Sequence, residues 1–200
     1  AAWTVALFVN ADNDLEYTWP RFTLPALKGL APNERVNVVA MVDWRDRKRG
    51  VELLEIRGKD VRVVASWPEK NFGSGKTLEW FLRQIARRYP ARHLAVGLWD
   101  HGYAWRYISR DDSSGGDRIT MPELRRALQD AGVDVDILAF DACNMAAVEV
   151  IYQLGLSGRV KYVVASEETI DQDGLPYDGA LGPLMAHPER EPRAVVQDVI

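Results

Sequence analysis

Two stretches of the chain, AVGLWDHG (residues 95–102) and DILAFDAC (residues 136–143), are built in the same way. Each is a mostly apolar run of about six residues that leads into a reactive side chain, His101 in the first and Cys143 in the second. Short apolar runs of this kind are typical of buried parallel strands, and ligands bind at the carboxyl ends of such strands. We therefore expect an α/β fold in which His101 and Cys143 lie at one edge of the sheet.

Cys143 is the only cysteine, so the chain has no internal disulfide. A lone cysteine often packs simply as a small hydrophobic residue. Here, however, it lies two residues beyond the strand and just before an expected helix from Met145 to Leu156. A helix N-terminus favours the thiolate, which is the nucleophilic form. These residues alone leave a structural thiol and a catalytic thiol as alternatives.

Four motifs occur in order along nearly the whole chain: WDHG (99–102), DDS (111–113), FDACNM (140–145) and ASEE (165–168). Together they resemble the successive motifs of the clostripain-like cysteine peptidases, a family of the caspase-like clan. The resemblance implies a caspase-like three-layer sandwich with a mostly parallel central sheet and helices on both faces. It also implies a cysteine endopeptidase. A non-catalytic caspase-like binding module is the alternative, although it would have no need for both His101 and Cys143.

The resemblance implies a dyad in which Cys143 attacks the peptide carbonyl and His101 protonates the leaving amine. The backbone N–H groups of Gly102 and Cys143 would hold the oxyanion, and a glycine suits this role because it lets the substrate approach closely. The sequence demands no third side chain to orient the histidine. A hydrogen-bonded loop histidine is the structural alternative for His101.

Asp141 is the position that the family uses to bind a basic side chain. Asp171 and Asp173, in the next strand-end loop, are candidates for a second acid. We expect cleavage after Arg and then Lys, because a guanidinium forms paired hydrogen bonds with a carboxylate. Asp141 could also cap the following helix, and the two roles are compatible.

Residues 103–117 are polar and rich in glycine, which is typical of a flexible loop beside a site. The resemblance implies self-processing in this loop, so Arg106 and Arg110 are candidate cleavage positions. Of the two, Arg110 has the more polar surroundings.

Three acidic residues in or beside the same loop, Asp111, Asp112 and Asp117, are candidate metal ligands. They lack the regular oxygen-ligand series of an EF-hand. The peptidase chemistry requires no cofactor, but the resemblance leaves a Ca²⁺ requirement open, because one member of the family uses the ion and others do not.

The composition, 47% hydrophobic and 27% charged over 200 residues, is that of one globular domain spanning residues 1–200. No apolar run approaches the roughly 20 residues that cross a bilayer. The net charge of −4 and the lack of a long Lys/Arg block argue against a nucleic-acid partner. We expect peptide or protein substrates with basic residues, no nucleic acid and no membrane; the sequence leaves the oligomeric state open.

The first residues do not form a signal peptide, so either the protein is cytoplasmic or its first residue follows a processing site. The family resemblance favours secretion. At the other end, a helix expected from Pro192 to Ile200 stops without a cap signal, and we expect a longer chain.

Outside the site, the patterns predict further strands and helices. Strands are expected at residues 3–9, 36–42 and 160–165, an edge β-hairpin at residues 51–56 and 61–66, and a helix at residues 22–30. Thr120 and Glu123 form a capping-box pattern for a helix that ends at Gly132. His93 and His187 are expected at the surface.

GSGKT (residues 73–77) resembles the end of a phosphate-binding loop. That motif requires a glycine five positions before Gly75, where the chain has Lys70, so nucleotide binding is disfavoured. We interpret Ser74 or Thr77 as the cap of a helix from Leu78 to Arg88.

Overall fold

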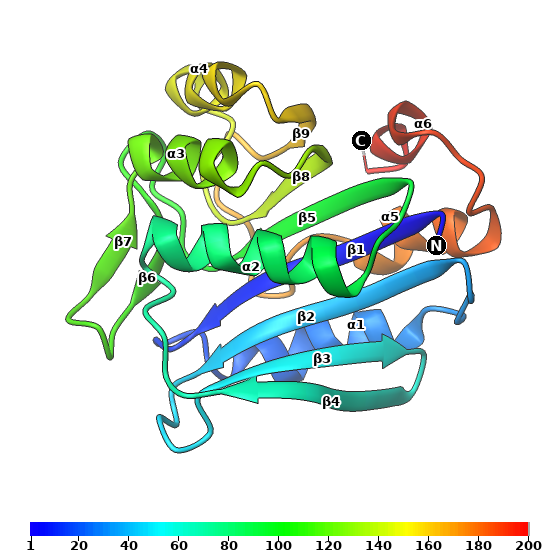
Figure 1. Cartoon of the computed structure of the whole chain (residues 1–200), viewed down its shortest axis with the longest axis horizontal. Helices are drawn as coiled ribbons and strands as arrows, with labels where there is room; N and C mark the ends of the chain where they lie inside the picture. Colours follow the sequence, from blue (N-terminus) through cyan, green and yellow to red (C-terminus); the bar gives the residue numbers. More distant parts are fainter. Residues whose placement is uncertain (200) are drawn as a thin grey trace.

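The computed structural model describes residues 1–199. Its elements in chain order are β1 (Trp3–Ala11), the π-helical turn η1 (Trp19–Thr23), α1 (Leu24–Gly29), β2 (Val36–Trp44), β3 (Val51–Arg57), β4 (Asp60–Trp67), α2 (Gly75–Arg88), β5 (His93–Trp99), β6 (Ile108–Asp111), β7 (Asp117–Ile119), α3 (Met121–Ala131), β8 (Val135–Asp141), α4 (Val148–Ser157), β9 (Val160–Val164), α5 (Tyr177–Ala186) and α6 (Pro192–Gln197). Figure 1 shows one twisted central sheet with helices on either side.

The central sheet has seven strands in the order β4-β3-β2-β1-β5-β8-β9. Strands β1, β2, β5, β8 and β9 are parallel neighbours, whereas β3 pairs antiparallel with both β2 and β4. The expected α/β class, mostly parallel sheet and edge hairpin are therefore confirmed. Strand β2 lies on one side of β1 and β5 lies on the other, so the direction in which strands are added to the sheet reverses at β1. Ligands of α/β proteins bind at such a reversal, beyond the carboxyl ends of the strands.

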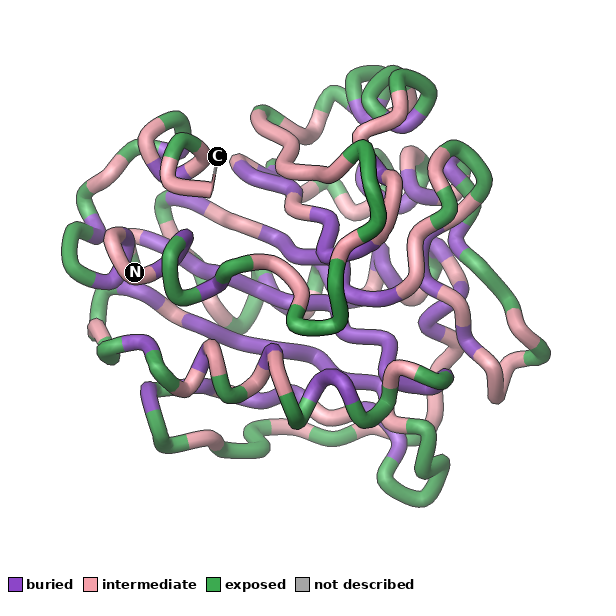
Figure 2. Tube along the Cα trace, turned by 180° about the vertical axis from the view of Figure 1, so that it is seen from behind, coloured by how far each residue is buried: buried purple, intermediate pink, exposed green. Residues whose placement is uncertain are grey.

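The core lies in two layers because side chains alternate along each strand. From β1, Ala6 and Phe8 pack toward α2, α3 and α4, whereas Val5 and Leu7 pack toward α1, α5 and α6. Seen from behind, the strands in the middle of the sheet are buried along most of their length, and the helices are exposed on their outer faces (Figure 2). This is the predicted three-layer sandwich.

Two helix starts follow the predicted caps. The Ser74 side chain accepts a hydrogen bond from the Lys76 N–H at 3.3 Å, and α2 begins at Gly75. Glu123 accepts from the backbone N–H of Thr120 at 2.9 Å, which forms the capping box of α3. The phosphate-loop pattern thus serves as a helix start here.

Other expectations need correction. The helix predicted from residue 22 starts at Trp19 as a π-helical turn, since Pro20 is tolerated where helical N–H groups lack partners. The loop of residues 103–117 contains one strand and the start of another, because β6 and β7 pair antiparallel. The last helix, α6, ends at Gln197, and Ile200 lies outside the described residues.

The expectation for His93 was wrong. Its ring is buried against Trp3, with the ring centroids 4.8 Å apart, and its Nδ1 atom lies 3.3 Å from Asp136. The cause is the pairing of β1 with β5, which places His93 directly beside Trp3. His187 is exposed, as expected.

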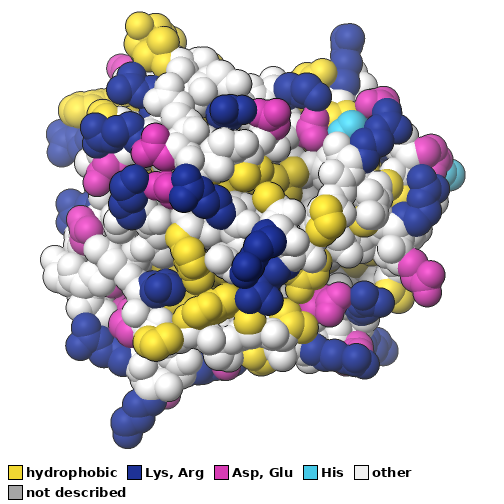
Figure 3. All heavy atoms as spheres, in the orientation of Figure 1, with side chains coloured by type: hydrophobic (Ala, Val, Ile, Leu, Met, Phe, Trp, Pro, Cys, Tyr) yellow, Lys and Arg dark blue, Asp and Glu magenta, His cyan; other side chains and the backbone are white. Residues whose placement is uncertain are grey.

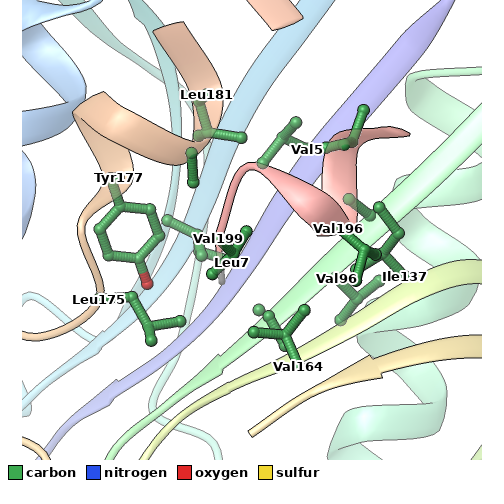
Figure 4. A pocket seen from close by; sticks show the side chains of 15 residues that line it. Val5, Leu7, Val96, Ile137, Val164, Leu175, Tyr177, Leu181, Val196 and Val199 are labelled. Atoms are coloured by element: carbon green, nitrogen blue, oxygen red, sulfur yellow. The ribbon is translucent and has the colours of Figure 1, made fainter. Parts of the chain in front are cut away.

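One small cavity of about 60 Å³ lies between the sheet and helices α5 and α6 (Figure 4). Its lining is apolar and includes Val5, Leu7 and Val164 from the strands and Leu181 and Val196 from the helices. A cavity of this size and character does not accommodate a peptide, so the substrate site must lie elsewhere.

Basic and acidic side chains are interspersed over the face of the molecule shown in Figure 3, without a continuous stripe of one sign. None of the helices described within residues 1–199 combines the length and the apolar character needed to cross a bilayer.

Candidate active site

The parallel pairing of β5 with β8 places His101 and Cys143 at the same edge of the sheet. Trp99 and Asp141, the last residues of the two strands, are direct partners, and His101 and Cys143 each lie two residues farther on. Both residues line one open pocket of about 290 Å³ at the carboxyl ends of the strands. The structure thus brings His101 and Cys143 together as the sequence predicted.

His101 has a partner that the sequence did not reveal. Its Nε2 atom lies 2.9 Å from Oδ1 of Asp14, in the loop that follows β1. The hydrogen bond and the charge of the histidine hold the pKa of Asp14 below its ordinary value. Asp14 belongs to an Asn/Asp-rich segment, residues 10–14, that by pattern alone indicated only a turn. The pairing therefore fixes the orientation of the imidazole.

A buried hydrogen-bond network supports the histidine loop from below. The carboxylate of Asp100 accepts from the Asn13 side chain at 2.8 Å and from the Arg110 N–H at 2.6 Å. Asn13 also donates to the Arg110 carbonyl at 2.8 Å. Burial raises the pKa of Asp100 well above its ordinary value. The network joins the loops after β1 and β5 to strand β6.

Cys143 is half-buried in a turn that precedes α4. Its sulfur accepts a hydrogen bond from the Ile170 N–H at 3.4 Å. Asn144 has a left-handed backbone, with φ of 61°, and α4 begins only at Val148. The helix expected from Met145 to Leu156 is present but begins three residues later than predicted, so Cys143 does not lie at its N-terminus and the argument from the helix dipole does not apply. The left-handed residue turns the chain away before the helix can begin.

Gly102 lies against the cysteine turn. A Cβ atom on this residue would be 2.5 Å from the Cys143 carbonyl oxygen and 3.0 Å from the Ala142 side chain. Any larger residue would push the histidine and cysteine loops apart. The absence of a side chain at Gly102 is thus a requirement for the close approach of the two loops.

Asp141 is buried at the base of the pocket. Its Oδ2 atom accepts from the Tyr177 hydroxyl at 2.7 Å, and Oδ1 accepts from the Leu175 N–H at 3.1 Å. Burial raises the pKa of this carboxyl group to about 6, against the effect of the two hydrogen bonds. Its oxygens accept from Leu175, in the loop before α5, and from Tyr177, the first residue of α5, so the alternative that Asp141 caps the helix after Cys143 is wrong. Tyr177 is a supporting residue that no local pattern indicated.

The two other acidic candidates, Asp171 and Asp173, differ in their position relative to the pocket. Both Asp171 and Asp173 are exposed, but Asp171 lines the pocket and Asp173 lies outside its lining. Among the described residues that line the pocket, four are aspartates and none is Lys or Arg; the four are Asp14, Asp100, Asp141 and Asp171. The pocket is therefore suited to a positively charged ligand.

The two candidate cleavage positions differ in structure. Arg106 lies in an exposed turn, where its N–H bonds to the Tyr103 carbonyl at 3.0 Å. Arg110 lies inside β6, with both its N–H and its carbonyl hydrogen-bonded in the network around Asp100.

The side chains of the three candidate metal ligands, Asp111, Asp112 and Asp117, do not point to a common site. Asp112 pairs with Arg110 at 2.8 Å, and Asp117 accepts from Asn71 at 2.7 Å. Asp111 alone is buried, within a different group of carboxylates.

A mostly parallel sheet between two helix layers, with a histidine and a cysteine after neighbouring strands, defines the class of cysteine peptidases with a caspase-like fold. A family model described as the clostripain family matches residues 8–200, and the chain belongs to this family.

Individual relatives agree with this assignment. Clostripain from Hathewaya histolytica is 25% identical, over 88% of this chain and 40% of its own. A secreted cysteine protease from Bacteroides thetaiotaomicron, solved with an irreversible peptide inhibitor, has a TM-score of 0.84 at 25% identity, over 100% of this chain and 57% of its own. An inactive protease zymogen from Parabacteroides distasonis has a TM-score of 0.76 at 23% identity, covering 99% of this chain and 56% of its own. The chain thus spans about half the length of these relatives.

Proposed function

We propose that this chain is a cysteine endopeptidase that cleaves peptide bonds after Arg, and less efficiently after Lys, with Cys143 and His101 as its dyad. The observation that carries the proposal is the pocket that both residues line, whose charged side chains at neutral pH are aspartates. Its natural substrates are proteins or peptides with basic residues. Since a similar protease from Bacteroides thetaiotaomicron is described as secreted, we propose the same for this protein.

In the proposed reaction the Cys143 sulfur attacks the carbonyl carbon of the scissile bond, and His101 protonates the departing amine. The oxyanion forms beside the backbone N–H groups of Gly102 and Cys143. The β-bridge between Gly102 and Ile108 consists of two hydrogen bonds, from the Tyr103 N–H to the Tyr107 carbonyl and from the Ser109 N–H to the His101 carbonyl. Within the described residues, the Gly102 N–H therefore has no hydrogen-bond partner. That N–H is available to the oxyanion.

Asp141 is proposed to bind the basic side chain of the substrate. A carboxylate has about four lone-pair positions, and two of those on Asp141 are occupied by Tyr177 and Leu175. The remaining positions can accept the paired N–H groups of a guanidinium, which a lysine ammonium matches less well. Asp171 is proposed as the second acid because it lines the same pocket. Asp173 contributes only at longer range.

Initial rates on fluorogenic peptides that differ only in the residue before the scissile bond (Arg, Lys, Asp or Leu) test the proposal. We expect turnover with Arg above Lys, none with Asp or Leu, and complete loss after iodoacetamide. Cleavage after Asp or Leu would overturn the role of Asp141 while keeping the dyad. A folded protein that cleaves none of the peptides would indicate a binding module.

Asp14 is proposed as a positioning residue for His101. Asp14→Ala should lower kcat about tenfold, because the imidazole loses its only described side-chain partner, while KM stays within about twofold. The effect is modest because the carboxylate is 70% exposed. Asp14→Glu should recover part of kcat. A wild-type kcat in Asp14→Ala, measured on the Arg peptide, would contradict the role.

Self-processing is proposed to occur after Arg106. A peptidase binds an extended, accessible segment, and Arg106 lies in an exposed turn, whereas the backbone of Arg110 is engaged within β6. Mass spectrometry of the intact protein over time should reveal fragments ending at Arg106 and beginning at Tyr107. Arg106→Ala should remove them and Arg110→Ala should not.

The same time course with Cys143→Ala is the control for contaminating proteases. An active enzyme that remains intact, or fragments that persist in Arg106→Ala, would contradict this position.

A further inference from the structure

A second open pocket lies beside the one that His101 and Cys143 line, which we call the active-site pocket. The second pocket has a volume of about 520 Å³, and among the described residues none lines both pockets. Its walls come from the chain just beyond each member of the dyad and from the loop after β9. They include Tyr103, Ala104, Asn144, Ala147, Val148 and Glu167. We call this space the Tyr103 pocket.

The two pockets lie on opposite faces of the sheet at the same edge. Leu15 and Trp99 of the active-site pocket belong to the core layer of α1, α5 and α6, whereas Ala147 of the Tyr103 pocket packs against the layer of α2, α3 and α4. The histidine loop and the cysteine turn each pass from one pocket to the other within two residues, a span of at most about 7 Å. A peptide held at Cys143 can therefore occupy both pockets with neighbouring side chains.

The proposed reaction gives the bound peptide a direction. The basic side chain before the scissile bond enters the active-site pocket toward Asp141. The amine that His101 protonates belongs to the next residue, which continues past the dyad and away from the active-site pocket. The Tyr103 pocket is the open space on that side of the dyad. This assignment rests on the proposed function.

The Tyr103 pocket is built by strained backbone. Ala104 and Asn144 are two of the three residues other than glycine with a left-handed backbone in the described chain, with φ of 48° and 61°, and both line this pocket. Such strain is concentrated at functional sites. The Asn144 N–H donates to the Glu168 carbonyl at 3.0 Å, and its side chain donates to the Glu167 carbonyl at 3.0 Å. These bonds hold the cysteine turn against the loop after β9, so the pocket is formed before a ligand binds.

The lining of the Tyr103 pocket is mostly apolar, with one charge. Tyr103 and Val148 are 55% and 76% exposed, so a ligand can cover them. The Tyr103 ring is held by stacking on Tyr107, with the ring centroids 5.8 Å apart, and by the Arg106 guanidinium 5.4 Å from its centroid. Among the described residues that line this pocket, only Glu167 carries a charge. The pocket thus suits an apolar side chain and repels an acidic one.

We propose that the Tyr103 pocket binds the residue that follows the scissile bond, and that it selects an apolar residue, with space for an aromatic ring, over glycine and over an acidic residue. The preference for Phe over Gly should be about tenfold, because an open pocket buries the side chain only in part. The discrimination against Asp should be smaller and should weaken with salt, because Glu167 is exposed.

Binding to the Cys143→Ala chain tests the pocket without catalysis. Labelled peptides that differ only in the residue after Arg (Phe, Gly or Asp) are titrated into this chain and followed by fluorescence anisotropy. We expect the Phe peptide to have a dissociation constant about tenfold below that of the Gly peptide, and the Asp peptide to bind most weakly. Equal constants, or no binding to folded protein, would overturn the proposal. Failure of the proposed function is a different result, namely no turnover of any Arg peptide by the active chain.

Acyl transfer in the active chain shows on which side of the scissile bond the pocket acts. An Arg ester leaves its acyl group as a thioester on Cys143, and an added amino acid amide can replace water as the attacking group. The carbon–nitrogen bond forms, the carbon–sulfur bond breaks, and the amine proton passes through His101 to the sulfur. The yield of transfer over hydrolysis should be about tenfold higher with Phe amide than with Gly amide, and lowest with Asp amide. Equal yields would mean that the pocket binds residues before the scissile bond and would overturn the assignment.

Tyr103→Ala and Tyr152→Ala form a matched pair, because both tyrosines are exposed and only Tyr103 lines the pocket. Tyr103→Ala should reduce the Phe-to-Gly ratio of transfer yields to about threefold or less, and Tyr152→Ala should leave it unchanged. Glu167→Lys changes only an exposed side chain and keeps the measurement decisive if Tyr103→Ala misfolds. It should raise the yield with Asp amide above that with Gly amide. Wild-type ratios in the folded variants of Tyr103 and Glu167 would overturn the proposal.

Discussion

Cys143→Ala is expected to lower kcat/KM for an Arg peptide by at least about 10⁴-fold, because no other thiol in the chain can replace the nucleophile. The fold should remain intact, since alanine fits the half-buried turn and the sulfur makes only weak hydrogen bonds with the backbone of Ile170, at 3.4 Å to its N–H and 3.9 Å to its carbonyl. The measurement is the initial rate on the Arg peptide, with the melting temperature as the check on folding.

His101→Ala should cause a loss of similar size. In the proposed dyad the two side chains act in one step, so the double variant should be little worse than either single variant. Iodoacetamide should add one group per chain, in proportion to the activity lost. Cys143→Ala with substantial remaining activity, or additive losses in the double variant, would contradict the dyad.

The sequence predicted the parts of the site that depend on local signals. Apolar runs ending at Trp99 and Phe140 marked two buried strands, and their parallel pairing places His101 and Cys143 at one pocket. The caps at Ser74 and Thr120 were equally local, because a cap satisfies N–H groups only a few residues away.

What the sequence missed depends on pairing between distant segments. Asp14 and His101 are 87 residues apart in the chain, and they meet only because β1 and β5 are neighbours in the sheet. The burial of His93 has the same origin. The late start of α4 follows from the left-handed backbone at Asn144, which a run of helix-forming residues does not reveal.

A group of four acidic residues shows the same limit: one carboxylate oxygen from each of Asp12, Asp43, Glu69 and Asp111 lies within 4.8 Å of the others. Its members come from the ends of four different segments, so no spacing pattern in the chain connects them. Asp111 was a candidate because it stands beside Asp112, yet its partners in space are Asp12, Asp43 and Glu69. Regular spacing in a sequence identifies residues that share one loop and misses groups that the sheet brings together.

Asp141→Asn is expected to lower kcat/KM for the Arg peptide by about 10²–10³-fold, since a guanidinium would enter the pocket without its charge partner. The loss should be specific: the rate of Cys143 alkylation should stay close to wild type, because the dyad is untouched. The preference for Arg over Leu should fall by a similar factor. An unchanged preference would mean that another acid, with Asp171 the nearest candidate, determines specificity.

The pH dependence isolates the contribution of this carboxyl group. With a pKa of about 6, Asp141 is charged above that pH and neutral below it, so kcat/KM for the Arg peptide should fall as the pH drops through about 6. Asp141→Asn retains the ionisations of the dyad and lacks this one. The difference between the two profiles therefore reports Asp141 alone.

Tyr177→Phe is the matched control because it keeps the carboxylate and removes one hydrogen bond to it. That hydrogen bond lowers the pKa of Asp141, so its loss should move the acid limb of the Arg profile to higher pH. At pH 8 the variant should cleave the Arg peptide at nearly the wild-type rate, because the carboxylate is then charged in both proteins. A limb that stays in place in Tyr177→Phe would show that the titrating group is not Asp141.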